Sequence, residues 1–182
     1  MIGKKLPDAT LKTRVCDEPV GGPNPYRWDR KATAHFFGGK RVALFSVPGA
    51  FTLTCSTYQL PDFERLTGAF KDAGIDEIYC ISVNDAFVMD AWDKHQDLKT
   101  VKLIPDGSGE FTRRVGMLVD KNNLGFRMRS WRYAAIVNDG TIKAWFEEPS
   151  FSDNCDDDPY GESSPPNILE KIAGASSDRA PA

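Results

Sequence analysis

The chain has 182 residues, 41% of them hydrophobic and 27% charged, and its formal net charge is −3. This length suits one domain with a single core, and the small negative charge gives no electrostatic attraction to nucleic acid or to anionic membranes. No apolar run approaches the roughly 20 residues that span a bilayer. Because the N-terminus, MIGKKLPDAT, lacks the apolar core of a signal peptide, we expect a cytoplasmic protein.

The first part of the chain predicts little regular structure before one buried strand. Residues 1–13 alternate weakly and favour a short strand. Residues 14–39 contain several Pro and Gly and are expected to be irregular, apart from a helical turn within residues 33–41. Residues 41–47, RVALFSV, form a continuous β-prone run, which predicts a strand buried on both faces.

A helix with one buried stripe is predicted for residues 56–74, and Gly74 ends it. Its apolar residues recur every three or four positions, at Leu60, Phe63, Leu66 and Phe70. Pro61 lies inside this segment, and its ring crowds the carbonyl four residues earlier. We therefore expect a kink one turn into the helix.

Strands and helices then alternate. Residues 76–83 predict a second buried strand, residues 85–95 a helix capped by Asn84, and residues 101–106 a short third strand. The inward-facing residues of that helix are expected to be Phe87, Val88, Ala91 and Trp92.

The C-terminal part predicts a hairpin and a last helix. A short helix is expected in residues 109–117, followed by a hairpin of residues 131–139 and 141–148 around an Asp-Gly turn. Residues 165–173 predict a terminal helix with Pro at its first positions, and residues 174–182 a disordered tail.

This order of elements predicts the fold class. Strand–helix–strand–helix–strand, then a hairpin and a helix, indicates an α/β protein with a thioredoxin-like fold, in which helices flank a central mixed β-sheet. No repeat or linker divides the chain, so we expect one domain over residues 1–173.

The four cysteines, Cys16, Cys55, Cys80 and Cys155, form no CxxC and no zinc-like spacing. Cys55 stands out because PGAFTLTCS places it at a predicted helix start, where unpaired N–H groups and the helix dipole favour a thiolate. The alternative is a buried structural cysteine, the common fate of a free thiol. We prefer that interpretation for Cys80, which lies within a predicted strand.

The segment PGAFTLTCS also fits the peroxiredoxin signature PxxxTxxC. Together with TYQLPDF, SVNDAFVMDAW, IPDGSGEF and RSWRYAAIVNDG, it resembles the type-5 peroxiredoxin class over residues 4–173. The resemblance is closest to the bacterial group in which such a domain can be fused to a glutaredoxin domain, and this chain is expected to lack that domain.

The resemblance implies a set of catalytic residues. Cys55 would attack the peroxide and become a sulfenic acid, Thr52 would hydrogen-bond the peroxide, and Pro48 would shield the thiolate. Arg132, in RSWRYA, matches the arginine that stabilises the thiolate and polarises the peroxide. Arg129 is a second candidate, but alternate strand positions point to opposite faces, and its alternative is a solvated surface charge.

Gln59 is a possible supporting residue, since it follows Cys55 by one helical turn and could hold the arginine over the thiol. Its alternative is a plain exposed helix residue. Leu53 departs from the family, which usually has Pro there; the change removes no catalytic group.

A sulfenic acid must be reduced by another thiol. Cys155 is a possible resolving cysteine, but four aspartates surround it in the loop DNCDDD, and their charge disfavours its thiolate. We therefore expect a one-Cys mechanism with glutathione/glutaredoxin or thioredoxin as reductant. That acidic loop lacks the spacing of an EF-hand, so we expect a solvated loop, no metal and no cofactor.

The predicted function is a thiol peroxidase that reduces hydrogen peroxide and alkyl hydroperoxides. The alternative is a redox-sensing or chaperone-like thioredoxin-fold protein without peroxidase turnover. The family resemblance also implies a homodimer, and the aromatic residues Phe45, Phe51 and Phe87 could form its contact face or could equally belong to the core.

Overall fold

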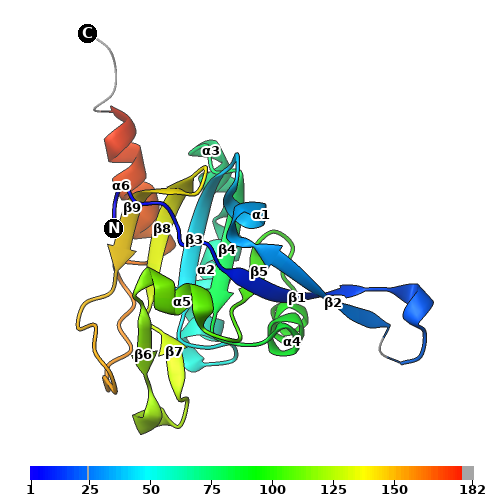
Figure 1. Cartoon of the computed structure of the whole chain (residues 1–182). Coiled ribbons are helices and arrows are strands. Elements are labelled where there is room, and N and C mark those ends of the chain that lie inside the picture. The colour runs from blue at the N-terminus through cyan, green and yellow to red at the C-terminus, as the bar shows by residue number, and fades with distance from the viewer. Residues whose placement is uncertain (24, 178–182) are drawn as a thin grey trace.

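The computed structural model describes residues 1–23 and 25–177. Within these residues, the central sheet has five strands in the order β5-β4-β3-β8-β9 (Figure 1). β3 (Arg41–Val47), β4 (Glu77–Ser82) and β5 (Lys102–Pro105) run parallel. The hairpin β8 (Tyr133–Asn138) and β9 (Thr141–Glu147) adds antiparallel to β3. The predicted α/β class with a central mixed sheet is therefore confirmed.

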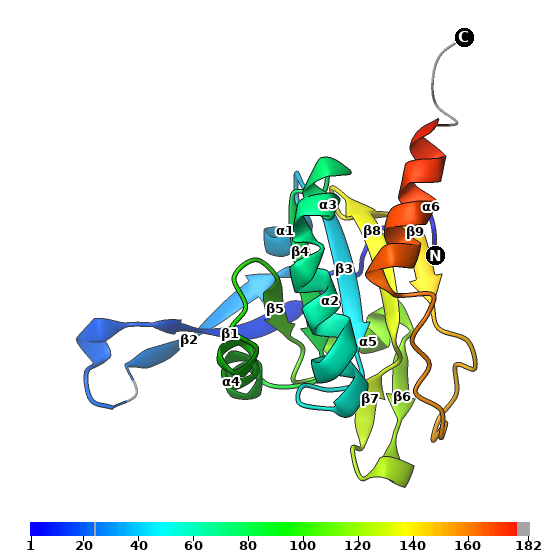
Figure 2. The same cartoon turned by 180° about the vertical axis from the view of Figure 1, so that it is seen from behind.

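Helices cover both faces of this sheet. On one face lie α2 (Leu60–Arg65), α3 (Thr67–Asp72), α4 (Ala86–Gln96) and α6 (Pro165–Ser177), which stand in front of the sheet in Figure 2. On the other face lie the short helices α1 (Thr33–Phe37) and α5 (Glu110–Val115) (Figure 1). The sheet is thus enclosed by two layers, as its continuous apolar strands predict.

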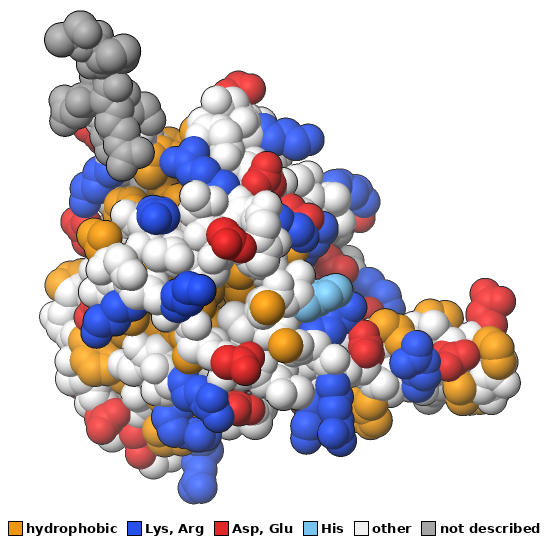
Figure 3. Space-filling model, turned by 45° about the horizontal axis from the view of Figure 1, so that its top comes forward, with side chains coloured by type: hydrophobic (Ala, Val, Ile, Leu, Met, Phe, Trp, Pro, Cys, Tyr) orange, Lys and Arg blue, Asp and Glu red, His pale blue; other side chains and the backbone are white. Residues whose placement is uncertain are grey.

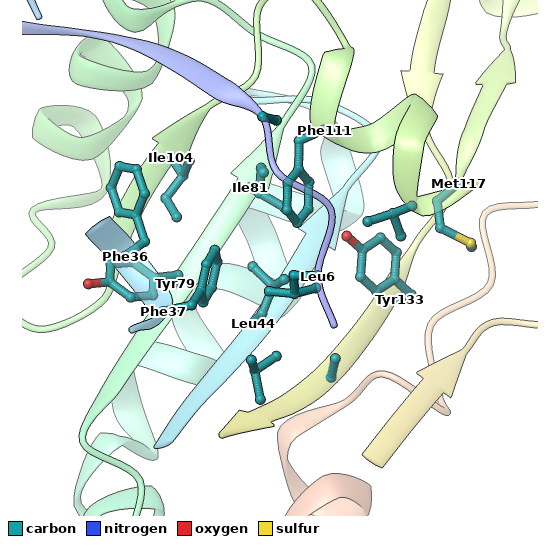
Figure 4. Packing of buried hydrophobic residues seen from close by; sticks show 14 of the residues in the cluster. Leu6, Phe36, Phe37, Leu44, Tyr79, Ile81, Ile104, Phe111, Met117 and Tyr133 are labelled. Carbon is teal, nitrogen blue, oxygen red and sulfur yellow. The ribbon is translucent and has the colours of Figure 1, made fainter. Parts of the chain in front are cut away.

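The alternation of β3 divides the core into two clusters. Val42 and Leu44 pack with Phe37 of α1 and Phe111 of α5. Figure 4 shows Phe37 beside Tyr79, and the Phe37 ring also stacks with that of Phe111. Ala43, Phe45 and Val47 face the opposite cluster, formed with α2, α3, α4 and α6. Phe45 is fully buried there, and its ring stacks on that of Phe63 with centroids 3.8 Å apart. Phe45 therefore belongs to the core and is not part of a dimer face.

Residues 14–39 are more regular than their composition predicts. β1 (Thr10–Cys16) pairs antiparallel with β2 (Tyr26–Ala32) over seven residue pairs, and this hairpin projects from the body as an arm (Figures 1 and 2). The short 3₁₀ helix η1 (Glu18–Val20) lies near its tip. The expectation of irregular structure was wrong because the residues of both strands are mostly polar, so the pairing leaves no apolar run to recognise in the sequence.

A second small hairpin extends the lower edge of the molecule. β6 (Leu118–Asp120) pairs antiparallel with β7 (Met128–Ser130), and the 3₁₀ helix η3 (Asn122–Leu124) lies between them (Figure 1). This hairpin leads directly into β8, and so it brings the residues just before β8 close to the end of β3.

Three local predictions need correction. The predicted helix over residues 56–74 is divided by a turn at Leu66 into α2 and α3. Asp85, rather than Asn84, caps α4: its carboxylate accepts from Phe87 N at 2.8 Å and from Val88 N at 3.0 Å. This cap turns α4 so that its buried residues are Ala86, Met89 and Trp92, whereas Phe87 and Ala91 are exposed.

The end of the chain also differs from its prediction. α6 remains helical through Ser177, so residues 174–177 do not belong to a disordered tail. Ala and Ser follow Gly174, and these residues tolerate a helical conformation even though the glycine costs about 1 kcal/mol relative to Ala. The rest of the expected tail, residues 178–182, lies outside the described residues.

One face of the surface carries charges of both signs. On the face shown in Figure 3, Lys and Arg side chains are interspersed with Asp and Glu. None of the helices described here is both long enough and apolar enough to cross a membrane.

Candidate active site

The turn after β3 places Cys55 inside the molecule. Ala50 N donates to Asn84 Oδ1 at 3.0 Å, and Thr52 Oγ1 donates to Gly49 O at 2.8 Å. Phe51 between them has a φ of 63°, in the left-handed region that non-glycine residues rarely adopt. The chain becomes helical at Leu53, and the Cys55 side chain is fully buried. One bond from Asn84 and one bond within the turn therefore maintain a strained backbone at Phe51, shortly before the thiol.

Gly49 is required in this turn for a packing reason. A Cβ at this position would lie 3.1 Å from the Thr52 methyl group and 4.0 Å from Arg129 Nε. A side chain at this position would therefore crowd Thr52, which lies three residues before Cys55.

The helix that carries Cys55 starts with an unusual turn. Residues Cys55–Gln59 form a π-helical turn, in which Leu60 N donates to Cys55 O five residues earlier. Pro61 follows; it has no N–H, and its ring would crowd an α-helical carbonyl. In place of a simple kink, the structure thus has a π-helical turn just before Pro61. Such single π turns are frequent at functional sites, and this one directs both Cys55 and Gln59 inward, where both are fully buried.

Arg132 reaches the thiol from the segment between β7 and β8. Its Nη1 donates to Cys55 Sγ at 3.5 Å and also contacts Gln59 Oε1. The Gln59 amide is oriented in turn by a 3.5 Å bond from its Nε2 to Ser46 O. Arg132 is only 1% exposed. The structure therefore brings together Cys55, Gln59 and Arg132, three of the residues singled out in the sequence.

Asp158 completes the surroundings of the guanidinium, and sequence reasoning missed it. Its carboxylate forms an ion pair with Arg132 Nη2, and the Tyr160 ring centre lies 5.7 Å from Arg132 Cζ. Asp158 belongs to the acidic loop that we interpreted as merely solvated, and it is in fact half exposed. With four aspartates in six residues, the sequence gives no signal as to which one faces an arginine elsewhere in the chain.

The loop that carries Asp158 is anchored by Glu148. This buried carboxylate accepts from Gly161 N and Ser163 N, both at 2.8 Å, and from Ser163 Oγ at 2.7 Å. Glu148 N donates to Arg132 O at 3.2 Å. One residue thus ties the loop to the backbone of the arginine.

The charges in this group influence one another. Burial acts to lower the pKa of Arg132, but the negative charges of Cys55 and Asp158 outweigh it, so the pKa of Arg132 is raised. Burial raises the pKa of Cys80 well above its usual value, and the charge of Cys55 adds to this effect. Cys80 is fully buried within β4, on the same side of the sheet as Cys55.

Arg129 lies close to Gly49 of the turn but bonds away from the thiol. Its Nη1 donates to Val83 O at the end of β4, and its guanidinium carbon lies 5.9 Å from the Phe126 ring centre. Burial lowers its pKa. Arg129 is therefore half-buried and supports the turn from outside, rather than being a solvated surface charge.

A hollow of about 160 Å³ opens next to these residues. Its lining comes from the turn, from the β6–β7 hairpin and from the acidic loop: Pro48, Thr52, Leu53, Lys121, Leu124, Phe126, Asp157 and Asp158. Among the described residues, no group of three or more His, Cys, Asp or Glu side chains is arranged to hold a metal.

The remaining cysteines lie apart from Cys55. Cys155 is partly buried and packs against the core cluster on the opposite face of the sheet, and its carbonyl accepts from Lys121 Nζ at 2.8 Å. Cys16 is exposed on the β1–β2 arm. All four cysteines, each within the described residues, are free thiols.

The fold and the site together define a thioredoxin-like protein with a buried, arginine-paired thiol at a helix start. The chain matches the Redoxin family model over residues 1–160. It is 66% identical over 167 residues to a peroxiredoxin of Rhizobium etli, a match that covers 92% of this chain and 93% of that protein. The chain therefore belongs to the peroxiredoxin family, whose members are thiol peroxidases.

Further similarities agree with the type-5 resemblance. The chain is 42% identical to the hybrid peroxiredoxin hyPrx5 of Haemophilus influenzae, covering 95% of this chain and 66% of that protein. Its structure resembles reduced Prx3 of Vibrio vulnificus in complex with H₂O₂, with a TM-score of 0.81, 32% identity and coverage of 97% and 98% of the two chains. Peroxiredoxin 5 of Alvinella pompejana gives a TM-score of 0.74 at 29% identity, with coverage of 96% and 98%. The predicted thioredoxin-like fold is thereby confirmed.

Proposed function

We propose that this peroxiredoxin reduces hydrogen peroxide and alkyl hydroperoxides through a sulfenic acid at Cys55. The observation that carries the proposal is the 3.5 Å contact between Arg132 Nη1 and Cys55 Sγ inside a buried site. A fixed planar cation beside the sulfur favours the thiolate, which is the attacking form. The hollow lined by Pro48, Thr52 and Asp158 lies next to this group, and we assign to it the approach of a small peroxide.

The reaction follows from these positions. The Cys55 thiolate attacks one peroxide oxygen, the O–O bond breaks, and the sulfur keeps that oxygen as Cys–SOH. The other oxygen leaves with the electron pair of the broken bond and takes up a proton, giving water or an alcohol. Thr52 Oγ1 already donates to Gly49 O, so its lone pairs are available to accept the peroxide O–H.

Arg132 would act on the oxygens as well as on the sulfur. Its Nε is buried and has no hydrogen-bond partner among the described residues. A buried donor without a partner is costly, and a bound peroxide oxygen would satisfy it. Gln59 and Asp158 each contact one end of the guanidinium, and we assign both the role of positioning it.

Stopped-flow measurement of peroxide consumption tests this proposal. Cys55→Ser should abolish the fast reaction, whereas Cys155→Ser, which changes a thiol on the other face of the sheet, should preserve the first oxidation. Peroxide consumption that survives Cys55→Ser would contradict the proposal. Peroxide oxidation without turnover by any thiol reductant would favour instead the redox-sensing or chaperone-like alternative.

For the return to the thiol, we propose a one-Cys cycle with glutathione/glutaredoxin or thioredoxin as reductant. The packing of Cys155 against the opposite core cluster supports this, because a disulfide needs its two Cα atoms within about 7 Å. The intact mass after one equivalent of peroxide should show one added oxygen. A loss of two hydrogens, abolished by Cys155→Ser, would instead establish Cys155 as the resolving cysteine; Cys80→Ser is the matched control.

We also propose a cytoplasmic homodimer. Phe51 in the active-site turn and Phe87 on α4 are 50% and 52% exposed, and burial of such rings is a common driving force for association. Sedimentation of the reduced protein should give twice the mass of the chain, and Phe87→Glu should shift it toward the monomer.

A further inference from the structure

The hollow beside the active-site turn combines apolar walls with two carboxylates. Pro48, Leu53, Leu124 and Phe126 supply most of its apolar lining, whereas Asp157 and Asp158, which are both exposed, supply its carboxylates. Thr52 lines the same hollow, and Arg132 links Asp158 to Cys55. A molecule that reaches the sulfur through this hollow must therefore pass close to negative charge.

The two cations next to the hollow, Arg132 and Lys121, are buried and hydrogen-bonded. Arg132 is 1% exposed and uses one end of its fork on Cys55 and Gln59 and the other on Asp158. Lys121 is 4% exposed, its Nζ donates to Cys155 O at 2.8 Å, and the same nitrogen lies 5.0 Å from the Trp131 ring centre. An incoming anion would thus meet the two exposed carboxylates before these two buried cations.

The carboxylates cannot easily move away. Glu148 fixes the C-terminal side of the loop through Gly161 and Ser163, and Lys121 fixes its N-terminal side through Cys155 O. Asp157 and Asp158 lie between these two anchors. The negative charge is thus a built part of the entrance rather than a feature of a loose surface loop.

We propose that Asp157 and Asp158 make this peroxidase selective by charge, so that neutral hydroperoxides react faster than anionic hydroperoxides of the same shape. The inference rests on the proposed function of Cys55 and adds a specificity determinant to it. A carboxylate several ångströms from a bound anion, in partly solvated surroundings, accounts for about a tenfold difference in rate.

The test compares cumene hydroperoxide with its para-carboxylate, which has the same reacting group and one added charge. In stopped flow, the wild type should react about tenfold faster with the neutral compound. Asp157→Asn leaves the Arg132–Asp158 pair in place and should reduce this ratio about threefold. Asp158→Asn keeps an oxygen for Arg132 and should reduce the ratio as well, whatever it does to the absolute rates.

Asp72→Asn is the matched control. It makes the same change in net charge on α3, at the opposite end of β3 from the hollow (Figure 2), and should leave the ratio unchanged. Because exposed charges are screened within about 10 Å at 0.1 M salt, the wild-type ratio should also shrink as salt is raised.

The outcomes separate the two proposals. If the wild type consumes neither hydroperoxide, both proposals fail. If it consumes cumene hydroperoxide but reacts with the carboxylate equally fast or faster, only charge selection fails. A neutral-over-anionic preference that both Asp→Asn variants leave unchanged would likewise overturn charge selection and assign the preference to the apolar walls.

Discussion

Replacement of Arg132 by glutamine tests how much the guanidinium contributes to the chemistry at Cys55. Arg132 Nη1 lies 3.5 Å from Cys55 Sγ. At that separation and an effective dielectric constant of about 20, two unit charges attract each other by about 5 kcal/mol. Since about 1.4 kcal/mol corresponds to a factor of ten, full loss of this attraction would slow the reaction by about three orders of magnitude. Water that enters the vacated space would compensate part of the loss.

We therefore expect Arg132→Gln to lower the second-order rate constant for hydrogen peroxide by about 10²- to 10³-fold. The rate constant of Arg132→Lys should lie between those of the wild type and Arg132→Gln. A single ammonium keeps the positive charge but cannot contact Cys55, Gln59 and Asp158 in the way that the planar guanidinium does. The measurement is the pre-steady-state oxidation rate of the pre-reduced protein after the reductant has been removed, with circular dichroism to establish that each variant is folded.

Arg129→Gln is the control for this experiment. It removes the same charge from a half-buried arginine whose hydrogen bond goes to Val83 O rather than to the thiol, and it should cost much less activity. A rate for Arg132→Gln within threefold of the wild type, or an equal loss for the two variants, would refute the reasoning that direct contact with the sulfur is decisive.

Three further predictions concern the frame around the site. Asn84→Ala removes the acceptor of Ala50 N. The loss should destabilise the protein by about 1–3 kcal/mol in urea unfolding and slow peroxide oxidation in stopped flow. An unchanged rate would mean that the turn keeps its conformation without this bond. Phe63→Ala removes a ring stacked on a core aromatic residue of β3 and should cost about 3–5 kcal/mol in urea unfolding; a loss below 1 kcal/mol would contradict the packing. For Glu77, burial acts to raise the pKa, but hydrogen bonds from Tyr79 and two lysines outweigh it and leave the pKa lowered. Its carboxylate therefore contributes stability above about pH 4.5, and this contribution is lost as the pH falls through the lowered pKa. Glu77→Gln should accordingly destabilise the protein at pH 7 by up to about 1 kcal/mol and have a smaller effect at pH 3, and an equal effect at both values would contradict the assignment.

The local features of this protein were determined by its sequence alone. The apolar run of β3, the helical spacing of Leu60, Phe63 and Phe70, and the Asp-Gly hairpin all depend on contacts within a short stretch of chain, so their patterns predict them directly. The motif PxxxTxxC works in the same way, because Thr52 and Cys55 are held on one tight turn. For these parts, composition and spacing carry the physical information.

The tertiary structure decided which distant residues meet. Arg132 lies 77 positions after Cys55, and Asp158 lies 26 positions after Arg132. Nothing in this spacing indicates that Cys55 and Asp158 both contact the guanidinium of Arg132. Asn84 was expected to cap a helix, yet the fold uses its amide to bind the turn at Ala50. The β1–β2 arm was missed because its pairing uses backbone hydrogen bonds between mostly polar residues. A sequence pattern reports contacts along the chain, whereas the reactivity of a thiol depends on the charges that packing brings to it.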